Sequence, residues 1–523
     1  MSGAAQAAAA STVPFDLFII GGGINGAGIA RDAAGRGLRV GLAEAADFAG
    51  ATSSASTKLI HGGLRYLEHF EFRLVAEALS EREKLLDIAP HIAWPLRFVM
   101  PHVPGLRPRW MIRTGLWLYD HLGGKSSLPR SHALRLSPQG PGAGLRPDIR
   151  NGFIYSDAWV DDARLVILNL KAAQQKGATI LARTRLLQAR RHGGLWHCDL
   201  LADGQISTVT SRALVNAAGP WVGEVERLVG SHAGSSRHAA LRLVRGSHLV
   251  LPRLYEGEHA YILQNSDRRI VFMIPYEGRF TLVGTTDVAQ DSMAEGASIS
   301  AAEEQYLLDA INRYLAKPAR AADIVWRYAG VRPLYDDESG DPSAVTRDYT
   351  LVLDAQEQTP LLSIYGGKIT TYRRLAEAAL AKLAPHLPHA GQSWTANEAL
   401  PGGDFARAER AAVLAQLQRS HAGLDPDWIA AAFARHGSTL AALLREVHTA
   451  AELGRDFGGG LFEREARWFI ENEWAREPDD VLWRRSKYGL HMSAEQRQAF
   501  AEWFRQNQQA TAAATREQAR EQD

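Results

Sequence analysis

Polar side chains gather in one short stretch, SSASTKLIHGGLRY, which runs from Ser53 to Tyr66. It places hydroxyl groups, a primary amine, an imidazole and a guanidinium close together in the chain. Such a set can bind and orient a small polar ligand, and an imidazole can accept a proton near neutral pH. The plain alternative is a solvated surface loop.

Three arginines stand in short motifs rather than in charge runs: Arg65 in GGLRY, Arg332 in GVRP and Arg347 in TRDY. A guanidinium can bind two oxygens of a phosphate or a carboxylate at once. A surface salt bridge is the common alternative for any one arginine. Together the three motifs predict a site for a small anionic substrate.

A glycine-rich turn precedes these residues in the chain. GGGING, from Gly21 to Gly26, follows a strand predicted for Phe15–Ile20 and leads into a helix predicted for Asn25–Gly35. The next predicted strand, Leu38–Glu44, ends in an acid. This order is typical of a dinucleotide-binding unit, in which backbone N–H groups bind the pyrophosphate and the acid binds the ribose. The predicted contacts are Gly21, Gly23, Ile24, Asn25, Gly26 and Glu44.

Two later glycine turns favour FAD over NAD as the dinucleotide. NAAGPW, Asn216–Trp221, follows a predicted strand and resembles the turn by which a flavoprotein chain returns to its nucleotide. YGGK, Tyr365–Lys368, also follows a predicted strand and leads into a helix, so its backbone donors suit the pyrimidine end of a flavin. Ordinary left-handed turns are the alternative for either stretch alone. The predicted contacts are Ala218, Gly219, Gly367 and Thr370.

Longer stretches resemble a known family. Gly21–Gly37, GGGINGAGIARDAAGRG, and Ala51–Glu68, ATSSASTKLIHGGLRYLE, are closely similar to the FAD-dependent glycerol-3-phosphate dehydrogenases of the respiratory, membrane-associated kind. The similarity covers nearly the whole chain, except the leader before Phe15 and the tail after about Phe504. Further motifs that carry it are YSDAWVDDA (155–163), RGSH (245–248), GTTD (284–287), GVRP (330–333), TRDY (346–349), GGKITTY (366–372) and LPGG (400–403).

The resemblance implies FAD as the cofactor and assigns roles around it. Ser53, Ser54 and Thr57 would contact the FAD pyrophosphate and the flavin ring, and His61 would lie near the isoalloxazine.

The resemblance also implies how the substrate is held. Arg65 and Arg347 would bind its phosphate, with hydroxyl groups from Tyr66 and Thr371. Arg332 and Lys368 would lie nearer the carbinol end.

The reaction implied by the resemblance is oxidation of sn-glycerol 3-phosphate to dihydroxyacetone phosphate. The C2 hydride passes to FAD, and the electrons then pass to ubiquinone. Arg332 is the candidate for stabilising the developing alkoxide. His61 is the favoured proton acceptor because its ordinary pKa is about 6.5. A core role for this histidine is nearly as well supported, and Lys368 would serve only if burial lowered its pKa.

One segment, Leu106–Tyr119, is both basic and aromatic. Its Trp110, Arg113 and Trp117 recur at helical spacing, which is more often a core-packing stripe than a membrane surface. The resemblance favours reversible attachment to the cytoplasmic face of the inner membrane, where ubiquinone is met. The sequence has no run of about eighteen apolar residues, so a spanning helix is not expected.

Composition limits the classes of function. The chain has 523 residues with 59 basic and 58 acidic side chains, so several domains are expected and a nucleic-acid partner is not. Its one cysteine, Cys198, reads as a packing residue, and no histidine pair stands beside a suitable carboxylate for a metal. The element pattern predicts an α/β protein: a Rossmann-like FAD-binding domain, a mixed β-rich substrate domain and a C-terminal all-helical domain.

Boundaries follow from where this pattern changes, at a Pro- and Gly-rich stretch near residue 388 above all. The helical domain carries no recognisable chemistry, and a second copy could pack there as a homodimer. A Pro- and Arg-rich stretch, Pro95–Arg113, is expected to interrupt a preceding helix. The predicted division is FAD-dependent region 14–388 (cofactor segments about 14–95, 152–235 and 345–388; substrate segments about 96–151 and 236–344), helical domain 389–510, and disordered ends 1–13 and 511–523.

Two rival functions remain open on the residues alone. The arginines could bind a carboxylate, so an amine or amino-acid oxidase that reduces oxygen fits the same motifs. A non-catalytic FAD-binding protein with a role in assembly or regulation fits the nucleotide motifs.

Overall fold

The computed structural model describes residues 13–230, 241–293, 296–335 and 348–522. Residues 1–12, predicted to be disordered, and Arg347, predicted to bind phosphate, lie outside this part of the chain. The chain forms two compact units, Met1–Leu400 and Pro401–Asp523.

The first unit contains a sheet in the order β17-β18-β10-β1-β2-β7, with the β8–β9 hairpin attached to β10. Strands β18, β10, β1, β2 and β7 run parallel, and their apolar sequences match strands that are buried on both faces. The bounds are β1 Phe15–Ile20, β2 Val40–Ala43, β7 Thr179–Leu181, β8 Thr184–His192, β9 Leu195–Ala202, β10 Gln205–Asn216, β17 Tyr349–Asp354 and β18 Leu361–Gly366.

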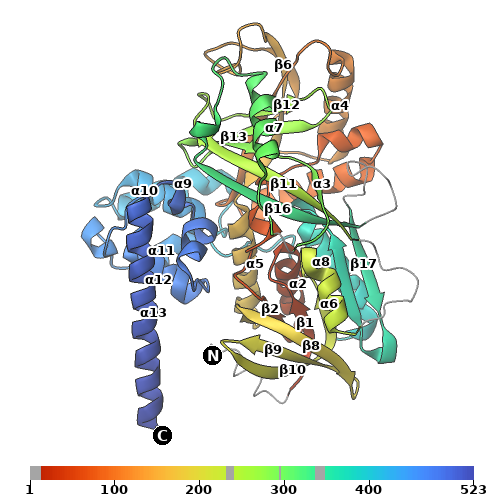
Figure 1. Ribbon diagram of the computed structural model, residues 1–523, viewed down its shortest axis with the longest axis vertical. Coiled ribbons are helices and arrows are strands. Elements are labelled where there is room, and N and C mark those ends of the chain that lie inside the picture. The colour runs from red at the N-terminus through yellow and green to blue at the C-terminus, as the bar shows by residue number, and fades with distance from the viewer. Residues whose placement is uncertain (1–12, 231–240, 294–295, 336–347, 523) are drawn as a thin grey trace. The chain divides into compact units, whose positions relative to one another are not determined.

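Helices cover this sheet, and α2 lies between α5 and α8 (Figure 1). The close packing requires small residues: a Cβ on Gly28 would lie 2.7 Å from the ring of Tyr372. Cys198 is buried in the same core, which confirms its reading as a packing residue. The bounds are α2 Ile24–Gly35, α5 Asp162–Gln175, α6 Val222–Leu228 and α8 Tyr372–Leu383. Helix α3, Phe72–Ile88, instead contacts strands of the other sheet of this unit.

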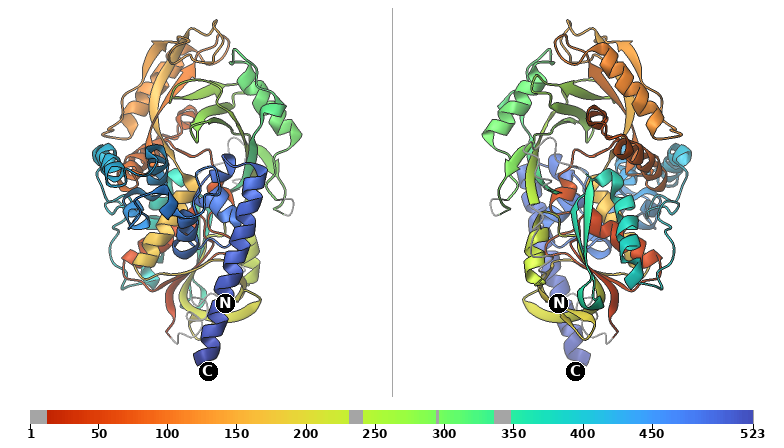
Figure 2. Two further views of the ribbon diagram at one scale, coloured as in Figure 1. Left: turned by 90° about the vertical axis from the view of Figure 1, so that its left-hand side faces the viewer. Right: turned by 90° about the vertical axis from the view of Figure 1, so that its right-hand side faces the viewer.

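A second, mixed sheet completes the first unit. Its path is β15-β11-β14-β13-β12-β4-β6-β3, with β16 paired to β11 and β5 to β6. Helices α4 and α7 lie on opposite sides of it (Figure 2). The bounds are β3 Leu59–Ile60, β4 Ala93–Pro101, α4 Arg109–Leu122, β5 His132–Arg135, β6 Asn151–Val160, β11 Leu241–Pro252, β12 Ala260–Gln264, β13 Ile270–Tyr276, β14 Phe280–Gly284, β15 Val288–Gln290, α7 Ala301–Asn312 and β16 Trp326–Tyr335.

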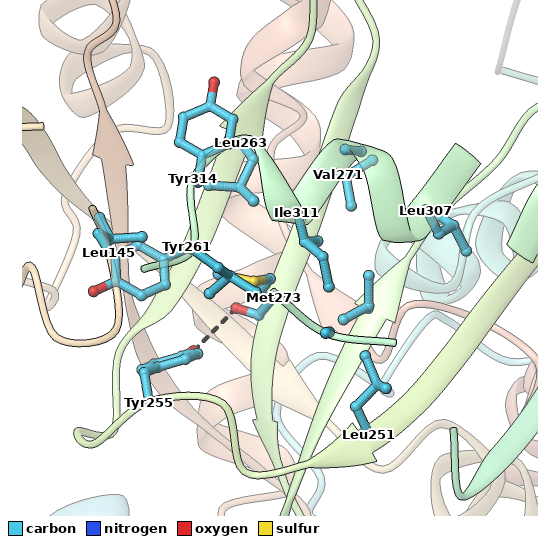
Figure 3. Packing of buried hydrophobic residues seen from close by; sticks show 14 of the residues in the cluster. Leu145, Leu251, Tyr255, Tyr261, Leu263, Val271, Met273, Leu307, Ile311 and Tyr314 are labelled. Atoms are coloured by element: carbon cyan, nitrogen blue, oxygen red, sulfur yellow. Dashed lines mark hydrogen bonds between the residues drawn. The ribbon is translucent and has the colours of Figure 1, made fainter. Parts of the chain in front are cut away.

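The core between this sheet and α7 shows the alternation expected of strands. Leu263 and Met273 point toward Ile311 of α7, and the Tyr255 hydroxyl donates a hydrogen bond to the Met273 carbonyl at 3.1 Å (Figure 3). The alternate residues of these strands face the other side of the sheet. Ile262 and Ile270 there line a cavity, and Phe272 lies beside His61 of the candidate site.

Two predicted boundaries in the first unit are wrong. Pro95–Arg113 does not merely interrupt a helix, because it contains most of β4 and the start of α4. Pro95 lies opposite Ala158 of β6 but outside the pairing of β4 with β12, which covers Phe98 and Val99, so its missing N–H costs no hydrogen bond to β12. The segment 152–235, assigned to the cofactor domain, begins with β6, which pairs with β4 in the second sheet.

The predicted boundary at residue 388 also differs from the structure. Residues 389–400 stay with the first unit because Trp394 packs on α2, where its indole N–H donates to the Asp32 carbonyl at 3.1 Å. Leu400 then donates a backbone hydrogen bond to Ile88 at 2.8 Å. Gly35 of α2 makes room for this indole ring because it has no side chain. A Cβ at Gly35 would clash with the Trp394 ring.

The second unit is helical, as predicted, and contains two buried clusters around Phe433 and Phe469. Helix α13 continues to Gln522, whereas the sequence analysis expected disorder from residue 511. Its alanine, glutamine, arginine and glutamate residues are strong helix formers, which explains the extension. The bounds are α9 Arg410–Ser420, α10 Pro426–His436, α11 Leu440–Leu443, α12 Glu463–Asn472, a π-helical turn Asp480–Arg485 and α13 Ala494–Gln522.

Candidate active site

The predicted dinucleotide turn lies at the carboxyl end of β1. Gly21 has a φ of +111°, and a Cβ at Gly26 would lie 2.0 Å from the Gly21 carbonyl oxygen. Only glycine at both positions therefore allows this close turn. The Glu44 carboxylate accepts the N–H groups of Gly22 at 2.7 Å and Ala46 at 2.8 Å. Burial raises the pKa of Glu44, and these N–H groups partly offset that effect.

A second glycine turn meets the first one. The Asn25 side-chain amide donates to the Gly366 carbonyl at 3.1 Å, and a Cβ on Gly367 would lie 3.2 Å from the same amide nitrogen. The Asn25 Oδ1 atom is buried without a hydrogen-bond partner within the described chain. Ser53 Oγ accepts the Ile24 N–H at 3.0 Å, close to Gly23. These closely packed glycine turns and the unsatisfied amide oxygen fit the pyrophosphate and flavin of FAD.

The third turn, after β10, lies beside the first. The carbonyl oxygen of Ala217 would be 2.5 Å from a Cβ on Gly21, and the Ala217 N–H donates to Ile20 at 2.8 Å. Ala218 is held by the Asn216 side chain at 3.3 Å, and Gly219 has a φ of +56°. Three turns that are far apart in the sequence therefore gather at the carboxyl ends of adjacent parallel strands, where α/β proteins bind nucleotides.

The segment that carries Ser53, Ser54 and Thr57 connects the two sheets. Ser54 is half-buried, and its hydroxyl donates to Ala51 at 3.4 Å within the same loop. Thr57 Oγ1 lies 2.9 Å from Nε2 of the buried His248. Burial lowers the pKa of His248 to about 3, and the positive charges of Lys58 and Arg332 add to this effect. This imidazole therefore stays neutral and serves as a hydrogen-bond partner.

Arg332 lies on β16, next to the cofactor loop. Its guanidinium pairs with Asp287 and donates to the Thr286 carbonyl at 3.2 Å. The neighbouring Val331 carbonyl accepts the Thr52 hydroxyl at 2.6 Å, and a Cβ on Gly366 would lie 3.8 Å from the Pro333 oxygen. The strand that carries Arg332 thus touches both the segment before Ser53 and the last glycine turn.

Two further loops bring the other candidates together. The His61 N–H donates to Thr370 Oγ1 at 3.3 Å, and the His61 ring lies 6.4 Å from that of Phe272. The Lys368 ammonium lies 3.8 Å from the centre of the Tyr66 ring. Residues 61–66 and 368–371 are therefore neighbours, and the buried Thr371 belongs to the same loop.

Arg65 lies in a short 3-10 helix, Leu64–His69, and lines a cavity of about 190 Å³ beside α4. The TRDY motif is described from Asp348 onward. Asp348 pairs at 2.6 Å with Arg73 of α3, the helix that follows Arg65 in the chain.

Four buried residues hold this site together in contacts that the sequence did not indicate: Lys58, Tyr119, Asp157 and Asp162. Lys58 was expected only as one of the polar groups of Ser53–Tyr66. Tyr119 was grouped with the aromatic residues that suit a membrane surface, and its burial contradicts that role. The two aspartates belong to the YSDAWVDDA motif, which carried the resemblance. The only signal for them in the sequence was the presence of carboxylates in an otherwise apolar stretch.

Two further features can be excluded for the part of the chain that the structure describes. No group of three or more His, Cys, Asp or Glu side chains there could hold a metal ion. No helix there has the length and apolar character needed to cross a membrane.

Comparisons with known proteins agree with this geometry. Residues 16–373 match the family described as FAD dependent oxidoreductase, and residues 393–509 match the C-terminal domain of alpha-glycerophosphate oxidase. A glycerol-3-phosphate dehydrogenase from Bacillus halodurans, solved with FAD, superposes with a TM-score of 0.73 at 25% identity, covering 96% of each chain.

Three curated relatives are more similar in sequence. Glycerol-3-phosphate dehydrogenase from Pseudomonas aeruginosa is 53% identical over 92% of this chain and 93% of its own. Aerobic glycerol-3-phosphate dehydrogenase from Escherichia coli is 50% identical, and D-erythritol 1-phosphate dehydrogenase from Brucella abortus is 48% identical, each over 94% of this chain and 97% of its own. The chain therefore belongs to the family of FAD-dependent glycerol-3-phosphate dehydrogenases.

Proposed function

We propose that the protein oxidises sn-glycerol 3-phosphate to dihydroxyacetone phosphate and passes the electrons to a membrane quinone. The observation that carries the proposal is the meeting of residues 61–66 with residues 368–371, beside the turns that fit FAD. These contacts bring together a lysine, a tyrosine and a threonine, in loops that also carry His61 and Arg65. Cationic and hydroxyl groups of this kind suit a phosphorylated alcohol.

The substrate is held by groups at two ends. Arg65, Tyr66 and Thr371, with Arg347, bind its phosphate, while Arg332 and Lys368 lie toward the carbinol. FAD supplies the two-electron acceptor for the C2 hydride. Negative charge that develops on the C2 oxygen is stabilised by the Arg332 guanidinium, which Asp287 and the Thr286 carbonyl hold in place.

The proton from the C2 hydroxyl passes to His61 in this proposal. The backbone of His61 is fixed by Thr370, which places its imidazole in the same loop pair as the substrate cations. Lys368 is a weaker choice because its ammonium already lies on the Tyr66 ring, where positive charge is favoured.

Anaerobic mixing with substrate tests the proposal. Glycerol 3-phosphate is expected to bleach the flavin absorbance, and glycine or sarcosine should leave it unchanged. D-Erythritol 1-phosphate, named for one close relative, is the necessary comparison. Faster bleaching by the four-carbon substrate would replace glycerol 3-phosphate in the proposal, and bleaching by the amino acids alone would overturn it.

Helix α4 supports attachment to a membrane surface. Trp110 and Trp117 are 71% and 59% exposed, while Ile112 and Leu116 face the protein. The expectation that the Trp110–Arg113–Trp117 stripe packs in a core is therefore wrong. Exposed tryptophans next to the exposed Arg109 and Arg113 suit the headgroup layer of an anionic membrane.

Changing both tryptophans to serine is expected to weaken binding to anionic lipid vesicles at least about tenfold, because their rings no longer enter the interface. Vesicle co-sedimentation measures this. The control is Ile206→Ser, which removes a similarly exposed apolar side chain (67%) from β10 of the other sheet. Equal loss of binding in the control would contradict a role for α4.

The cavity beside Arg65 is our candidate for the quinone. Its lining is mainly apolar, and it lies between the 3-10 helix of Arg65, helix α4 and the second sheet. The residues that line it include Leu64, Leu67, Met100, Met111, Leu118, Ile262 and Ile270.

Gly115 of α4 lines this cavity, and a Cβ there would meet no atom within 4 Å. Gly115→Phe is therefore expected to fill the cavity without straining the helix and to lower quinone reduction at least about tenfold. Anaerobic bleaching by glycerol 3-phosphate should be unchanged. Gly115→Ala is the matched control, and equal quinone reduction by both variants would count against this location.

A further inference from the structure

We propose that Asp157 and Asp162 are positioning residues that separately anchor the two halves of residues 53–66: Asp162 the half that faces FAD, and Asp157 the half that faces the substrate. The inference deepens the proposed function, on which its substrate half rests. Asp157 lies on β6 and Asp162 begins α5, and both carboxylates are fully buried.

Asp162 organises the first half through several hydrogen bonds. Its carboxylate accepts the Lys58 ammonium at 2.6 Å and the N–H and hydroxyl of Ser56 at 3.1 and 2.7 Å. Lys58 in turn donates to the Ser54 carbonyl at 3.1 Å. The backbone from Ser54 to Lys58 is thus wrapped around one carboxylate.

This half also reaches the strand of Arg332. The Tyr328 hydroxyl donates to the Ser56 carbonyl at 2.8 Å, and the Lys58 ammonium lies 5.4 Å from the centre of the Tyr328 ring. Lys58 has a φ of +60°, a conformation that few side-chain-bearing residues adopt. The buried ion pair with Asp162 compensates for this backbone cost, so the pair holds a shape that the loop would not take alone.

Asp157 acts on the second half through Tyr119. The Gly62 N–H donates to the Tyr119 hydroxyl at 2.7 Å, and that hydroxyl donates to Asp157 at 2.8 Å. Arg82 donates to the same carboxylate at 2.9 Å. Gly62 stands between His61 and Arg65, so this chain of contacts sets the position of the residues that are to meet the substrate.

The two anchors are separated by a short rigid element. Strand β3 pairs with β6 through Leu59 opposite Trp159 and Ile60 opposite Ala158. Motion of one half is therefore not passed freely to the other. This separation predicts that loss of one anchor affects FAD retention and loss of the other affects substrate affinity.

Two variants of the full chain test this division. Tyr119→Phe keeps the ring but removes the hydroxyl that accepts the Gly62 N–H and donates to Asp157, so that the backbone at Gly62 retains only its direct interaction with Asp157. We expect the KM for glycerol 3-phosphate to rise about tenfold, with the dissociation constant of FAD within twofold of wild type. Asp162→Asn should raise the dissociation constant of FAD about tenfold and change the visible circular dichroism of the bound flavin. Its KM, measured at saturating FAD, should stay within twofold of wild type.

Controls separate positioning from loss of folding. Asp161→Asn changes the adjacent acid, which caps α5 by accepting the Arg164 N–H, and asparagine can make the same cap. It should resemble wild type. If Asp162→Asn fails to fold with Lys58 unpaired, Lys58→Met/Asp162→Asn removes both charges and should show the same FAD phenotype.

The outcomes decide between the explanations. If Tyr119→Phe and Asp162→Asn weaken FAD retention and substrate affinity alike, or if neither changes them, the proposal is wrong. If wild-type flavin is not reduced by glycerol 3-phosphate, the proposed function fails instead. The FAD measurements on Asp162→Asn would then still test the first anchor.

Discussion

Replacing Arg332 with alanine is expected to slow reduction of the flavin by glycerol 3-phosphate by a factor of about 10²–10³, the usual cost of losing a donor that stabilises developing negative charge. The guanidinium lies on β16, beside the loop of Ser53 and the Gly366 turn. Anaerobic stopped-flow absorbance measures the rate. FAD content should be unchanged, because the glycine turns that fit FAD come from other strands.

Arg332→Lys separates charge from geometry. A lysine keeps the positive charge but cannot both pair with Asp287 and donate to the Thr286 carbonyl as the guanidinium does. We expect an intermediate rate, well below that of wild type.

The matched control is Arg327→Ala. Arg327 lies on the same strand, and its side chain is 42% exposed in an ion pair with Glu304 at the surface. Its loss should leave flavin reduction within twofold of wild type. If both alanine variants reduced the flavin equally slowly, the slower rate would come from disturbance of strand β16 and not from loss of the Arg332 charge. If neither were slow, Arg332 would have no role in stabilising the alkoxide.

The parts of the fold that could be predicted are those with a strong local pattern. The run Phe15–Ile20, followed by glycines and a helix, forms the strand, turn and helix that the sequence indicates. Strand β4 was missed because Pro95 and Pro101 argue against a strand, and only the pairing pattern in the sheet makes them acceptable. The place of Trp394 on α2 was equally invisible, since nothing near it in the sequence indicates that contact.

In the candidate site, too, the parts with a strong local sequence pattern could be predicted and the long-range contacts could not. Glycine turns and arginine motifs are recognisable locally, and the structure brings Asn25 to the Gly366–Gly367 turn as the nucleotide interpretation requires. The pairing of Lys58 with Asp162 joins residues 104 positions apart. A lysine in a polar loop and an acid at a helix start each have ordinary local explanations, so only the folded chain shows that they form one buried pair.

A second large effect is expected in the helical unit, where Glu465→Gln should lower its free energy of unfolding by about 3–5 kcal/mol. The Glu465 side chain is fully buried and accepts Arg435 at 3.0 Å, His436 at 2.8 Å and the Tyr488 hydroxyl at 2.7 Å. A glutamine in its place carries no negative charge to pair with Arg435 and cannot accept all these donors. Thermal unfolding followed by far-ultraviolet circular dichroism measures the loss.

The pH dependence gives an independent check on this cluster. Burial alone would raise the pKa of Glu465, but the Arg435 guanidinium and the His436 hydrogen bond lower the pKa to about 2. Because the unfolded carboxyl titrates near its ordinary pKa of 4.5, the stabilisation is present above that pH and is lost as the pH falls toward 2. The difference in stability between wild type and Glu465→Gln should therefore shrink over this range.

Glu471→Gln is the matched control, since Glu471 follows on the same helix, α12, and is exposed. It should leave stability within about 0.5 kcal/mol of wild type. Hydrogen exchange measured on peptides from α10 and α12 locates the effect, because α12 carries Glu465 and α10 carries its partners Arg435 and His436. Equal stability of the two glutamine variants, or a difference that does not depend on pH, would mean that the buried carboxylate is neutral rather than ionised. The charges of Arg435 and Glu465 would then contribute nothing to holding the helices together.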